Sequence, residues 1–430
     1  MIHKARTSVI RVATGQLARN IAGTFATRII VAAMGVGMTV IVARALGPEG
    51  RGVYSVAFAV AAFAIQFGNL GLHAANTYYI ARDRRLLPSI FGNSLLVGFG
   101  GGVGLAFFSW GIFSFWPALA PIQGAPLWIA LAWIPFGIAY LLVQNIMLGI
   151  GNVRTFNRVE LVRQGMLLLL LAFLAWWGAS SADLYLAVSL ATQVLVLWLI
   201  VSAVLKVMEG KPRFSLDLFC LHVRYGLKAY VAAAFAFAVL RADLLMVQYF
   251  MGSESTGQYS IAVAIADLLT MLPVAVGTVL FPRLCAIDDE REKSLLVRRV
   301  AVMLAGVLLV ATLLLEVVSG TLVTLLFGEA YARATKATMI LLPGAALLGV
   351  NTVLMNYFAS MGMPMFTVYS PALALATNLF LNLWLIPLYG IEGAAMASVA
   401  AYGFMLVASL VYMGWKRIGH GTEICLGGDT

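Results

Sequence analysis

The chain has 430 residues, of which 62% are hydrophobic and only 11% are charged, and its mean hydropathy is +0.95. A soluble protein does not need so much apolar surface for its core, so the composition excludes that class. A helix needs about 20 mostly apolar residues to cross a hydrocarbon layer about 30 Å thick. The sequence therefore predicts an all-α integral membrane protein.

Apolar stretches of this length follow one another along the whole chain, separated by short polar breaks. We expect about twelve transmembrane helices. They are predicted at residues 21–43, 53–79, 89–115, 127–149, 164–180, 184–205, 229–251, 258–281, 301–326, 338–359, 366–388 and 394–415.

The basic residues predict the orientation, because short cytoplasmic loops retain Lys and Arg. Residues 1–20 are basic, and the apolar run after them has no small-residue cleavage pattern, so an uncleaved first helix is expected. With this segment inside, nearly all of the 28 Lys and Arg residues fall on the inner side. The exceptions are Arg28, Arg44, Arg51, Arg241, Arg333 and Lys336. Both the N-terminal segment and the tail at 416–430 are therefore expected in the cytoplasm.

Tryptophan residues agree with this orientation, because aromatic belts form where helices leave the membrane. Those predicted near the outer ends are Trp110, Trp116, Trp128, Trp176, Trp177 and Trp384. The net charge of +10 is then explained by topology and by attraction to anionic lipid. A nucleic-acid partner is not expected.

One phrase occurs twice, as LGPEGRGVYS at 46–55 and as MGSESTGQYS at 251–260. Each copy follows an outward-going helix, the first or the seventh, so an even number of helices separates the two and orientation is preserved. The sequence therefore predicts two six-helix lobes, at 21–207 and 229–415, related by a parallel pseudo-two-fold repeat. A cytoplasmic linker at 208–228 joins them.

We interpret the repeated phrase as architecture rather than chemistry. Gly47 and Gly252 are expected to end a helix in a conformation that side chains resist. Tyr54 and Tyr259 are expected to anchor the next helix at the membrane interface.

Other glycines are interpreted in the same way. GFGGGVG at 98–104 looks superficially like a phosphate loop, but it lacks a Lys-Ser/Thr ending and a preceding strand, so close helix packing is expected. Gly151 after the fourth helix and Gly362 after the tenth form a fainter echo of the repeat.

Enzymatic and metal-binding signals are missing from the sequence. No His or Cys pair has ligand spacing, and neither a nucleophile elbow nor a paired catalytic carboxylate occurs. We therefore expect no metal, no cofactor and no enzyme. The scattered residues are His3, His73, His222 and His420, with reduced thiols predicted on the inner side at Cys220, Cys285 and Cys425.

Five charged residues fall inside predicted helices, where each is costly unless it faces a cavity or a partner. Arg241 lies deep in the seventh helix, whereas Arg28 is close enough to the inner end for its guanidinium to reach the headgroups. Asp243 follows Arg241 by two positions and points elsewhere, so Asp267 or Glu316 is the expected partner of Arg241. Each acidic residue is equally interpretable as half of a structural ion pair or as a proton site.

Amide side chains inside the helices are candidates for sugar contacts. They are Gln144, Asn145, Asn351 and Asn356. Asn and Gln are also ordinary hydrogen-bonding residues between membrane helices, and this alternative remains open.

Three segments carry a resemblance to a known family: LGPEGRGVYS at 46–55, GNLGLHAANTYYIAR at 68–82 and NLFLNLWLIPLYGIEGAAMAS at 378–398. With them, essentially the whole chain resembles the polysaccharide flippases of the multidrug/oligosaccharidyl-lipid/polysaccharide exporter superfamily. The resemblance implies a V-shaped pair of lobes around a central cationic cavity. It also implies transport of undecaprenyl-diphosphate-linked oligosaccharides to the periplasmic leaflet of the bacterial inner membrane, for O-antigen, capsule or exopolysaccharide synthesis. A polysaccharide polymerase or chain-length regulator is an implied partner.

Our leading hypothesis is a flippase in which Arg28 and Arg241 bind the diphosphate or acidic sugars. Family members similarly carry a cavity-facing Arg in the first helix, and Arg offers planar, permanently charged donors to phosphate. One of Asp243, Asp267 or Glu316 would couple transport to an ion.

Three alternatives remain. The first is a proton- or sodium-coupled multidrug antiporter of the same superfamily, in which the acidic residues matter most. The second is a membrane enzyme that polymerises or ligates the glycan, but the longest outer loop, at 116–126, is short and uncharged. The third is a membrane scaffold that transports nothing. Such a protein would have no evident need for the five charged residues inside its helices.

Overall fold

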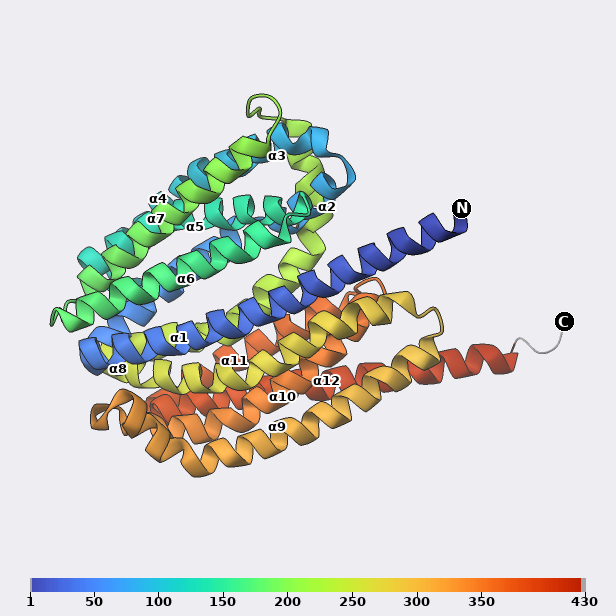
Figure 1. Ribbon diagram of the computed structural model, residues 1–430. Helices are drawn as coiled ribbons and strands as arrows, with labels where there is room; N and C mark the ends of the chain where they lie inside the picture. The colour runs from blue at the N-terminus through green and yellow to red at the C-terminus, as the bar shows by residue number, and fades with distance from the viewer. Residues whose placement is uncertain (1, 427–430) are drawn as a thin grey trace. The chain divides into compact units, whose positions relative to one another are not determined.

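The computed structural model describes the backbone of residues 2–426 and the side chains of residues 23–227 and 229–415. The basic N-terminal segment and the tail therefore lie outside the described side chains. All regular elements in the described part are helical, which confirms the predicted fold class (Figure 1). The α-helices are α1 (Ile2–Gly68), α2 (Leu72–Arg82), α3 (Leu87–Leu95), α4 (Gly102–Phe115), α5 (Ala125–Gly149), α6 (Val153–Trp176), α7 (Ala182–Val207), α8 (Leu216–Ala286), α9 (Glu290–Phe327), α10 (Ala334–Ser360), α11 (Phe366–Tyr389) and α12 (Ile391–Leu426). Short helical turns lie at Arg84–Leu86, Leu96–Gly101, Pro117–Leu119 and Glu329–Tyr331.

In the described part, 10 helices are long and apolar enough to cross a membrane, but two of them are too long for one crossing. The apolar part of α1 has 46 residues and that of α8 has 58. At about 1.5 Å per residue, each is more than twice the thickness of the hydrocarbon layer. Each also contains one non-helical residue, Gly47 in α1 and Gly252 in α8. These breaks divide α1 and α8 into two crossings each, which accounts for the twelve predicted helices.

The two glycines adopt the conformation that the sequence predicted. Gly47 has φ 67° and ψ −179°, and Gly252 has φ 76° and ψ −178°. Side chains resist this region, so glycine is required at both places. The fainter echo is also visible in the backbone, since φ is 82° at Gly151 and 84° at Gly362.

The predicted helix at 53–79 is wrong as a single helix, because the chain leaves helical geometry between α1 and α2. Asn69 is fully buried in this break. Its amide nitrogen donates to the carbonyls of Ile65 and Gln66 at 3.2 and 2.6 Å, and its oxygen accepts from the N–H of Gly71 at 2.9 Å. One side chain thus satisfies backbone groups that the break would otherwise leave unpaired in an apolar setting.

The predicted start of the fifth membrane helix, at 164–180, is also wrong. α6 begins at Val153, and the side chain of Asn152 caps its first turn. The charged residues of this stretch made it look like a loop. Instead, Glu160 and Arg163 pair on one face of the helix, which lets the helix continue through them.

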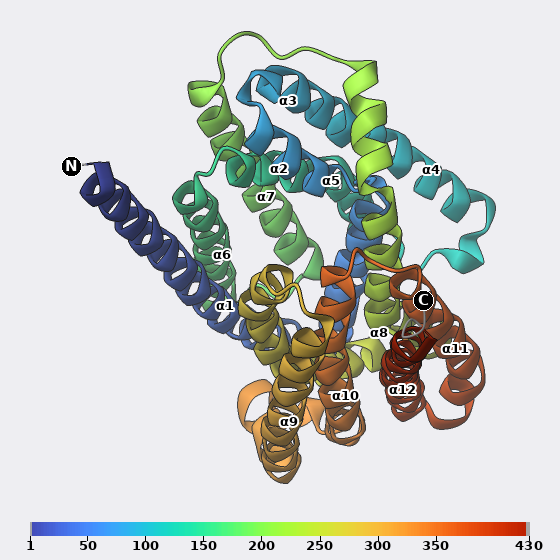
Figure 2. The ribbon, with the colours of Figure 1, turned by 90° about the vertical axis from the view of Figure 1, so that its right-hand side faces the viewer.

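The chain forms two compact units, residues 1–46 with 57–227 and residues 47–56 with 228–430. In the first unit α5 is the most buried helix, and it packs against α2 and α7. In the second unit α10 is the most buried and packs against α9 and α12, while α11 packs against α12 (Figure 2). The fourth and tenth membrane helices, which correspond in the repeat, are thus the central helices of their units.

Within the second unit, the two copies of the repeated phrase touch each other. A Cβ added to Gly52 would collide with the carbonyl group of Ser253, and one added to Gly257 would collide with that of Pro48. Gly52 corresponds to Gly257 in the repeat and Pro48 to Ser253, so the contact is reciprocal. Backbones approach this closely only where glycine removes the side chain.

The expectation that the two tyrosines of the phrase anchor helices at the interface is wrong. Tyr54 is only 7% exposed and Tyr259 is fully buried. Tyr259 instead directs its hydroxyl to Asp243, at 2.5 Å. The phrase therefore contributes a polar partner as well as a turn.

The predicted linker at 208–228 lies against the first unit, and we call its residues 208–216 the strap. The N–H of Arg213 donates to the carbonyl of Pro88 at 3.1 Å. The Asn93 side chain bonds to both backbone groups of Ser215, at 2.9 and 3.0 Å. The strap is therefore held to α3 at three points, and Figure 2 shows it crossing α3 before α8 begins.

Aromatic rings hold the first turns of α8 against α2. The His222 ring stacks on Tyr79 with centroids 4.5 Å apart, and Tyr225 stacks on Tyr78 at the same distance. His222 is buried, and its Nε2 has no hydrogen-bond partner among the described residues. Burial lowers the pKa of His222 from 6.5 to about 4.

Replacing Gly257 with Ala should lower the free energy of unfolding by about 1–3 kcal/mol, because an added methyl group would force the two copies of the phrase apart. Thermal unfolding in detergent micelles measures the change. Gly306→Ala is the matched control, since a Cβ there meets nothing within 4 Å. Equal effects of the two substitutions would contradict the close contact.

His222 should make the protein sensitive to acid. The pKa of His222 is about 4 in the folded protein and 6.5 in its ordinary state. Between these pH values the imidazole therefore binds a proton in the unfolded chain but not in the folded one. Stability should therefore fall as the pH drops from about 6.5 towards 4. Unfolding temperatures measured across this range should fall less steeply for His222→Phe, and identical slopes would rule out the role of His222.

Candidate functional site

The second unit contains a carboxylate buried inside a membrane-spanning helix. Asp243 on α8 is 2% exposed. One of its oxygens accepts from the hydroxyls of Tyr259 and Ser398, at 2.5 and 2.9 Å, and the other accepts from the N–H of Leu244 at 2.7 Å. These three donors replace water around the carboxylate, which would be costly to bury without them.

Two asparagines of α11 extend this network. Asn378 donates to the Ser398 hydroxyl at 3.3 Å, and Asn382 donates to the oxygen of Asn378 at 2.9 Å. All three side chains are fully buried, and the oxygen of Asn382 has no hydrogen-bond partner among the described residues. A continuous chain of hydrogen bonds thus links Asn382, through Asn378 and Ser398, to Asp243.

Arg241 lies two residues before Asp243 on α8, yet it does not pair with Asp243. Its Nη2 lies 2.8 Å from Oδ2 of Asp267, and both side chains are about one-third exposed, at 35% and 37%. Of the two expected partners of Arg241, Asp267 is therefore the one observed, while Glu316 lies half-buried on α9. A cavity of about 20 Å³ is lined by Asp243 and Asp267 together, beside Tyr402. It offers room for about one water molecule or a small ion between two carboxylates.

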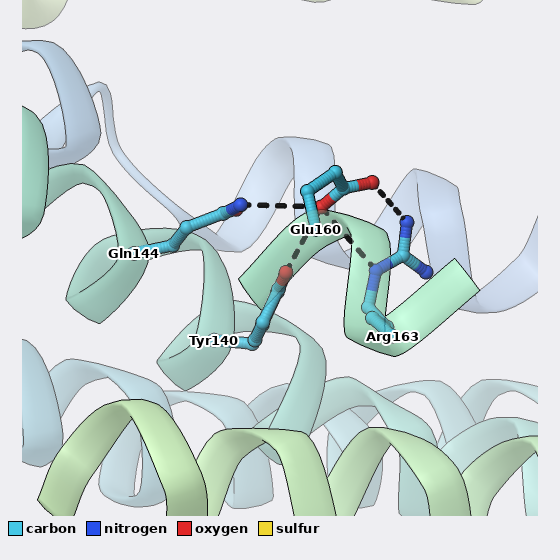
Figure 3. A network of polar contacts seen from close by, with 4 residues as sticks. All are labelled: Tyr140, Gln144, Glu160 and Arg163. Atoms are coloured by element: carbon cyan, nitrogen blue, oxygen red, sulfur yellow. Dashed lines mark hydrogen bonds and ion pairs between the residues drawn. The ribbon is translucent and has the colours of Figure 1, made fainter. Parts of the chain in front are cut away.

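The first unit contains a separate network around Glu160 (Figure 3). One oxygen of Glu160 accepts from the Tyr140 hydroxyl at 3.0 Å and from the Gln144 amide at 3.1 Å. The other accepts from Nη2 of Arg163 at 2.5 Å, and the Arg163 guanidinium lies over the Tyr140 ring. All four residues lie on membrane-spanning helices α5 and α6, and the pair is about one-quarter exposed. The charges of Glu160 and Arg163 balance each other, and both carboxylate oxygens of Glu160 have hydrogen-bond donors.

The sequence reasoning missed Glu160 and Arg163 because it placed them in a loop. The available signal was their spacing of three residues, which aligns opposite charges on one helix face. Asn378, Asn382 and Ser398 were noted only as part of a family resemblance. Their periodic placement on two neighbouring helices gave no sign that they lead to Asp243.

The four amide candidates lie in different surroundings. The Gln144 amide donates to the carboxylate of Glu160, as Figure 3 shows. Asn351 is buried and accepts from the Ser409 hydroxyl at 2.7 Å. Asn145 and Asn356 each donate to a carbonyl of their own helix, at 2.8 Å.

The two arginines proposed for phosphate binding belong to different units. Arg28 is exposed on α1 in the first unit, and Arg241 is half-buried in the second. The described residues contain no group of three His, Cys, Asp or Glu side chains that could hold a metal ion. Cys220 and Cys285 are free and exposed.

Solved structures with similar folds define the class of protein. A lipid II flippase, MurJ, in its inward closed conformation matches with a TM-score of 0.72 and 15% identity, over 91% of this chain and 87% of that one. An inward-facing multidrug resistance MATE transporter of the MOP superfamily matches with a TM-score of 0.74 and 13% identity, over 92% and 96% of the two chains. The protein is a multi-pass membrane protein with the fold of the MOP-superfamily transporters.

Sequence comparison identifies the family. The profile of the polysaccharide biosynthesis proteins matches residues 41–336, well over half of the chain. The chain therefore belongs to the polysaccharide biosynthesis protein family, as its resemblance predicted. It is also 28% identical over 163 residues to the probable flippase AglR of Haloferax volcanii, a match covering 36% of this chain and 34% of that protein. The matched part spans less than half the length of the curated relatives.

Replacing Tyr259 with Phe should destabilise the protein by about 1–3 kcal/mol, because buried Asp243 would lose a donor that nothing replaces. Tyr249→Phe is the matched control, since Tyr249 lies on the same helix and is 60% exposed. Thermal unfolding in detergent micelles should separate the two variants. A Tyr259→Phe protein as stable as the control would mean that Asp243 does not depend on this hydroxyl.

Proposed function

We propose that this protein flips undecaprenyl-diphosphate-linked oligosaccharides across the cytoplasmic membrane for polysaccharide synthesis, by alternating access. Membership of the polysaccharide biosynthesis family supports the biosynthetic role. The MOP-type fold, shared with a lipid II flippase, supports transport rather than enzymatic chemistry. In this proposal the membrane is the bacterial inner membrane, both termini are cytoplasmic, and a polymerase or chain-length regulator receives the product.

The observation that carries the proposal is the Arg241–Asp267 ion pair within membrane-spanning parts of α8. An arginine at this depth is costly, and a partly exposed one can still meet a ligand. Arginine binds phosphate through planar, paired donors and keeps its charge in apolar surroundings. A diphosphate headgroup is the anion in a lipid-linked sugar that most needs such a partner.

Asp267 connects substrate binding to ion binding in this proposal. A diphosphate that pairs with Arg241 competes with Asp267, whose carboxylate is then left without its partner. Because Asp267 shares a small cavity with Asp243, the released carboxylate can take up a proton or a small cation there. Substrate and ion would then strengthen each other's binding by the same factor, as coupled equilibria require.

The antiporter alternative rests on the same acidic residues. A multidrug antiporter of this fold would use Asp243 and Asp267 to exchange an ion for a cationic drug, with no need for Arg241. Resistance to a drug that survives Arg241→Ala but is lost in Asp267→Asn would favour this alternative.

Alanine at Arg241 or Arg28 should reduce the outer-leaflet pool of undecaprenyl-diphosphate oligosaccharide by about tenfold or more, because a charge-assisted contact to phosphate is lost. The pool is measured in spheroplasts with a membrane-impermeant glycosidase added from outside. The deletion strain defines the background. Arg291→Ala is the control, since Arg291 is exposed near the start of α9.

The outcomes separate the parts of the proposal. If the glycan is equally accessible without the protein, the flippase assignment fails. If export needs the protein but both alanine variants transport normally, the arginines are not the phosphate site.

A further inference from the structure

The first unit carries a charged pair inside a membrane-spanning helix that the function described so far does not use. Glu160 and Arg163 both lie on α6. Arg163 comes ten residues after Val153, where α6 begins, which places it about 15 Å along the helix at about 1.5 Å per residue. This is about half the thickness of the hydrocarbon layer, where a charged side chain needs a partner or a cavity.

Glu160 has hydrogen-bond donors that do not depend on Arg163. Its Oε2 accepts from the Tyr140 hydroxyl at 3.0 Å and from the Gln144 amide at 3.1 Å, and both donors belong to α5. These two neutral groups still contact the carboxylate if the guanidinium moves away, so the charge is not left without donors in an apolar setting. The network therefore allows Arg163 to exchange its partner.

Arg163 uses only part of its guanidinium in this pair. Nη2 donates to Oε1 of Glu160 at 2.5 Å, and Nε lies 3.4 Å from Oε2. Nη1 makes no hydrogen bond to the described part of the chain, and Figure 3 shows it turned away from the carboxylate. The side chain is also 25% exposed. A donor at this depth is costly without an acceptor, so the spare nitrogen indicates an acceptor that the protein itself does not supply.

The other charged residues of α6 favour an anion as that acceptor. The helix carries three arginines and one acidic residue, Glu160. Arg154 and Arg158 are exposed, towards the end of α6 that is predicted to face the cytoplasm. An excess of positive charge attracts anions and repels cations.

The framework of the lobe does not require this ion pair. Aligned by the fainter glycine echo, Glu160 and Arg163 correspond to Pro371 and Ala374 on α11 of the second unit. No residue of α11 is charged, yet the second unit forms this helix and packs it against α12. The pair therefore distinguishes the first unit and is not part of the repeated architecture.

We propose that Arg163 binds an anionic group of the substrate, a phosphate or a carboxylate, and that Glu160 holds the guanidinium until this group displaces it. Arginine offers planar, paired donors to either anion and keeps its charge in apolar surroundings. The guanidinium carbon lies 5.7 Å from the centre of the Tyr140 ring, a contact that can persist during the exchange. This inference rests on the proposed function and adds an anion-binding arginine in the first unit to Arg241 in the second.

Binding to the protein in nanodiscs of phosphatidylcholine tests the site. Farnesyl diphosphate supplies a diphosphate, and dodecyl glucuronide supplies the carboxylate of an acidic sugar. Farnesol and dodecyl glucoside are their uncharged counterparts, and microscale thermophoresis measures each Kd. The native protein should bind at least one charged probe about tenfold more tightly than its counterpart, and that probe identifies the source of the anion. Equal binding of charged and uncharged probes overturns the proposal.

Glu160→Gln is the most informative variant, because it removes the carboxylate that competes with the ligand and keeps nearly the same shape. Affinity for the anion should rise by about tenfold, whereas an ion pair that only stabilises the fold predicts no gain. Arg163→Gln should lower the affinity by about tenfold, and the double variant should bind as weakly as Arg163→Gln.

Two controls match these changes of charge. Glu209→Gln also removes one negative charge, from an exposed position on the strap, and Arg158→Gln removes one positive charge from an exposed position on α6. Neither residue belongs to the network of Figure 3, so both variants should bind the probes as the native protein does. A gain in Glu209→Gln equal to that in Glu160→Gln would reduce the effect to net charge and overturn the proposal.

Arg163→Lys separates binding from folding, because an ammonium can still pair with Glu160. The variant should unfold at the native temperature and bind the anion about threefold more weakly, since it lacks the planar pair of donors. Native affinity in this variant, or no gain in a Glu160→Gln protein that unfolds at the native temperature, overturns the proposal.

The binding measurements also separate this inference from the flippase proposal. If the outer-leaflet glycan depends on the protein but the affinities do not change as expected, the Arg163 site alone fails. If the affinities change as expected but the glycan is equally accessible without the protein, the anion site stands and the flippase proposal fails.

Discussion

Every backbone polar group inside a membrane must find its partner within the protein, and the rest of this structure depends on that constraint. It explains why the described part is helical throughout and why each break in a helix has a specific remedy. At Gly47 and Gly252 the chain turns through a conformation that only glycine tolerates easily. At Asn69 a buried amide replaces the missing backbone partners.

The same constraint determines that charged side chains inside the membrane have partners within the protein. Asp243 is surrounded by three donors, Asp267 is paired with Arg241, and Glu160 is paired with Arg163. The two units repeat their backbone but not this chemistry. Aligned by the repeated phrase, Asp243 corresponds to Met38, and no carboxylate stands there. The site around Asp243 therefore has no equivalent at the corresponding position of the first unit.

The residues of the candidate site differ in how far the sequence could predict them. Arg241 and Asp267 stood out because charges in apolar runs are rare. The spacing of Asp243, two residues from Arg241, pointed to another partner but left Asp267 and Glu316 both open, and only the structure chose Asp267. Glu160 and Arg163 did not stand out, because three arginines and a glutamate in one stretch resemble a solvated loop. Tyr259 was taken for an interface anchor, since nothing local distinguishes a buried tyrosine from one at the membrane surface.

By itself, the sequence determined the helical, membrane-spanning class and the glycine turns, because run length and backbone conformation are local properties. It did not determine every helix boundary, since Asn69 breaks the predicted helix at 53–79 and α6 begins at Val153. Only the tertiary structure decided which polar groups meet. Asp243 and Ser398 are 155 residues apart in the chain, yet their side chains lie 2.9 Å apart. The structure also showed which glycines of GFGGGVG pack closely, since that depends on neighbouring helices: a Cβ on Gly98 or Gly102 would collide with α5, whereas one on Gly104 would meet nothing within 4 Å.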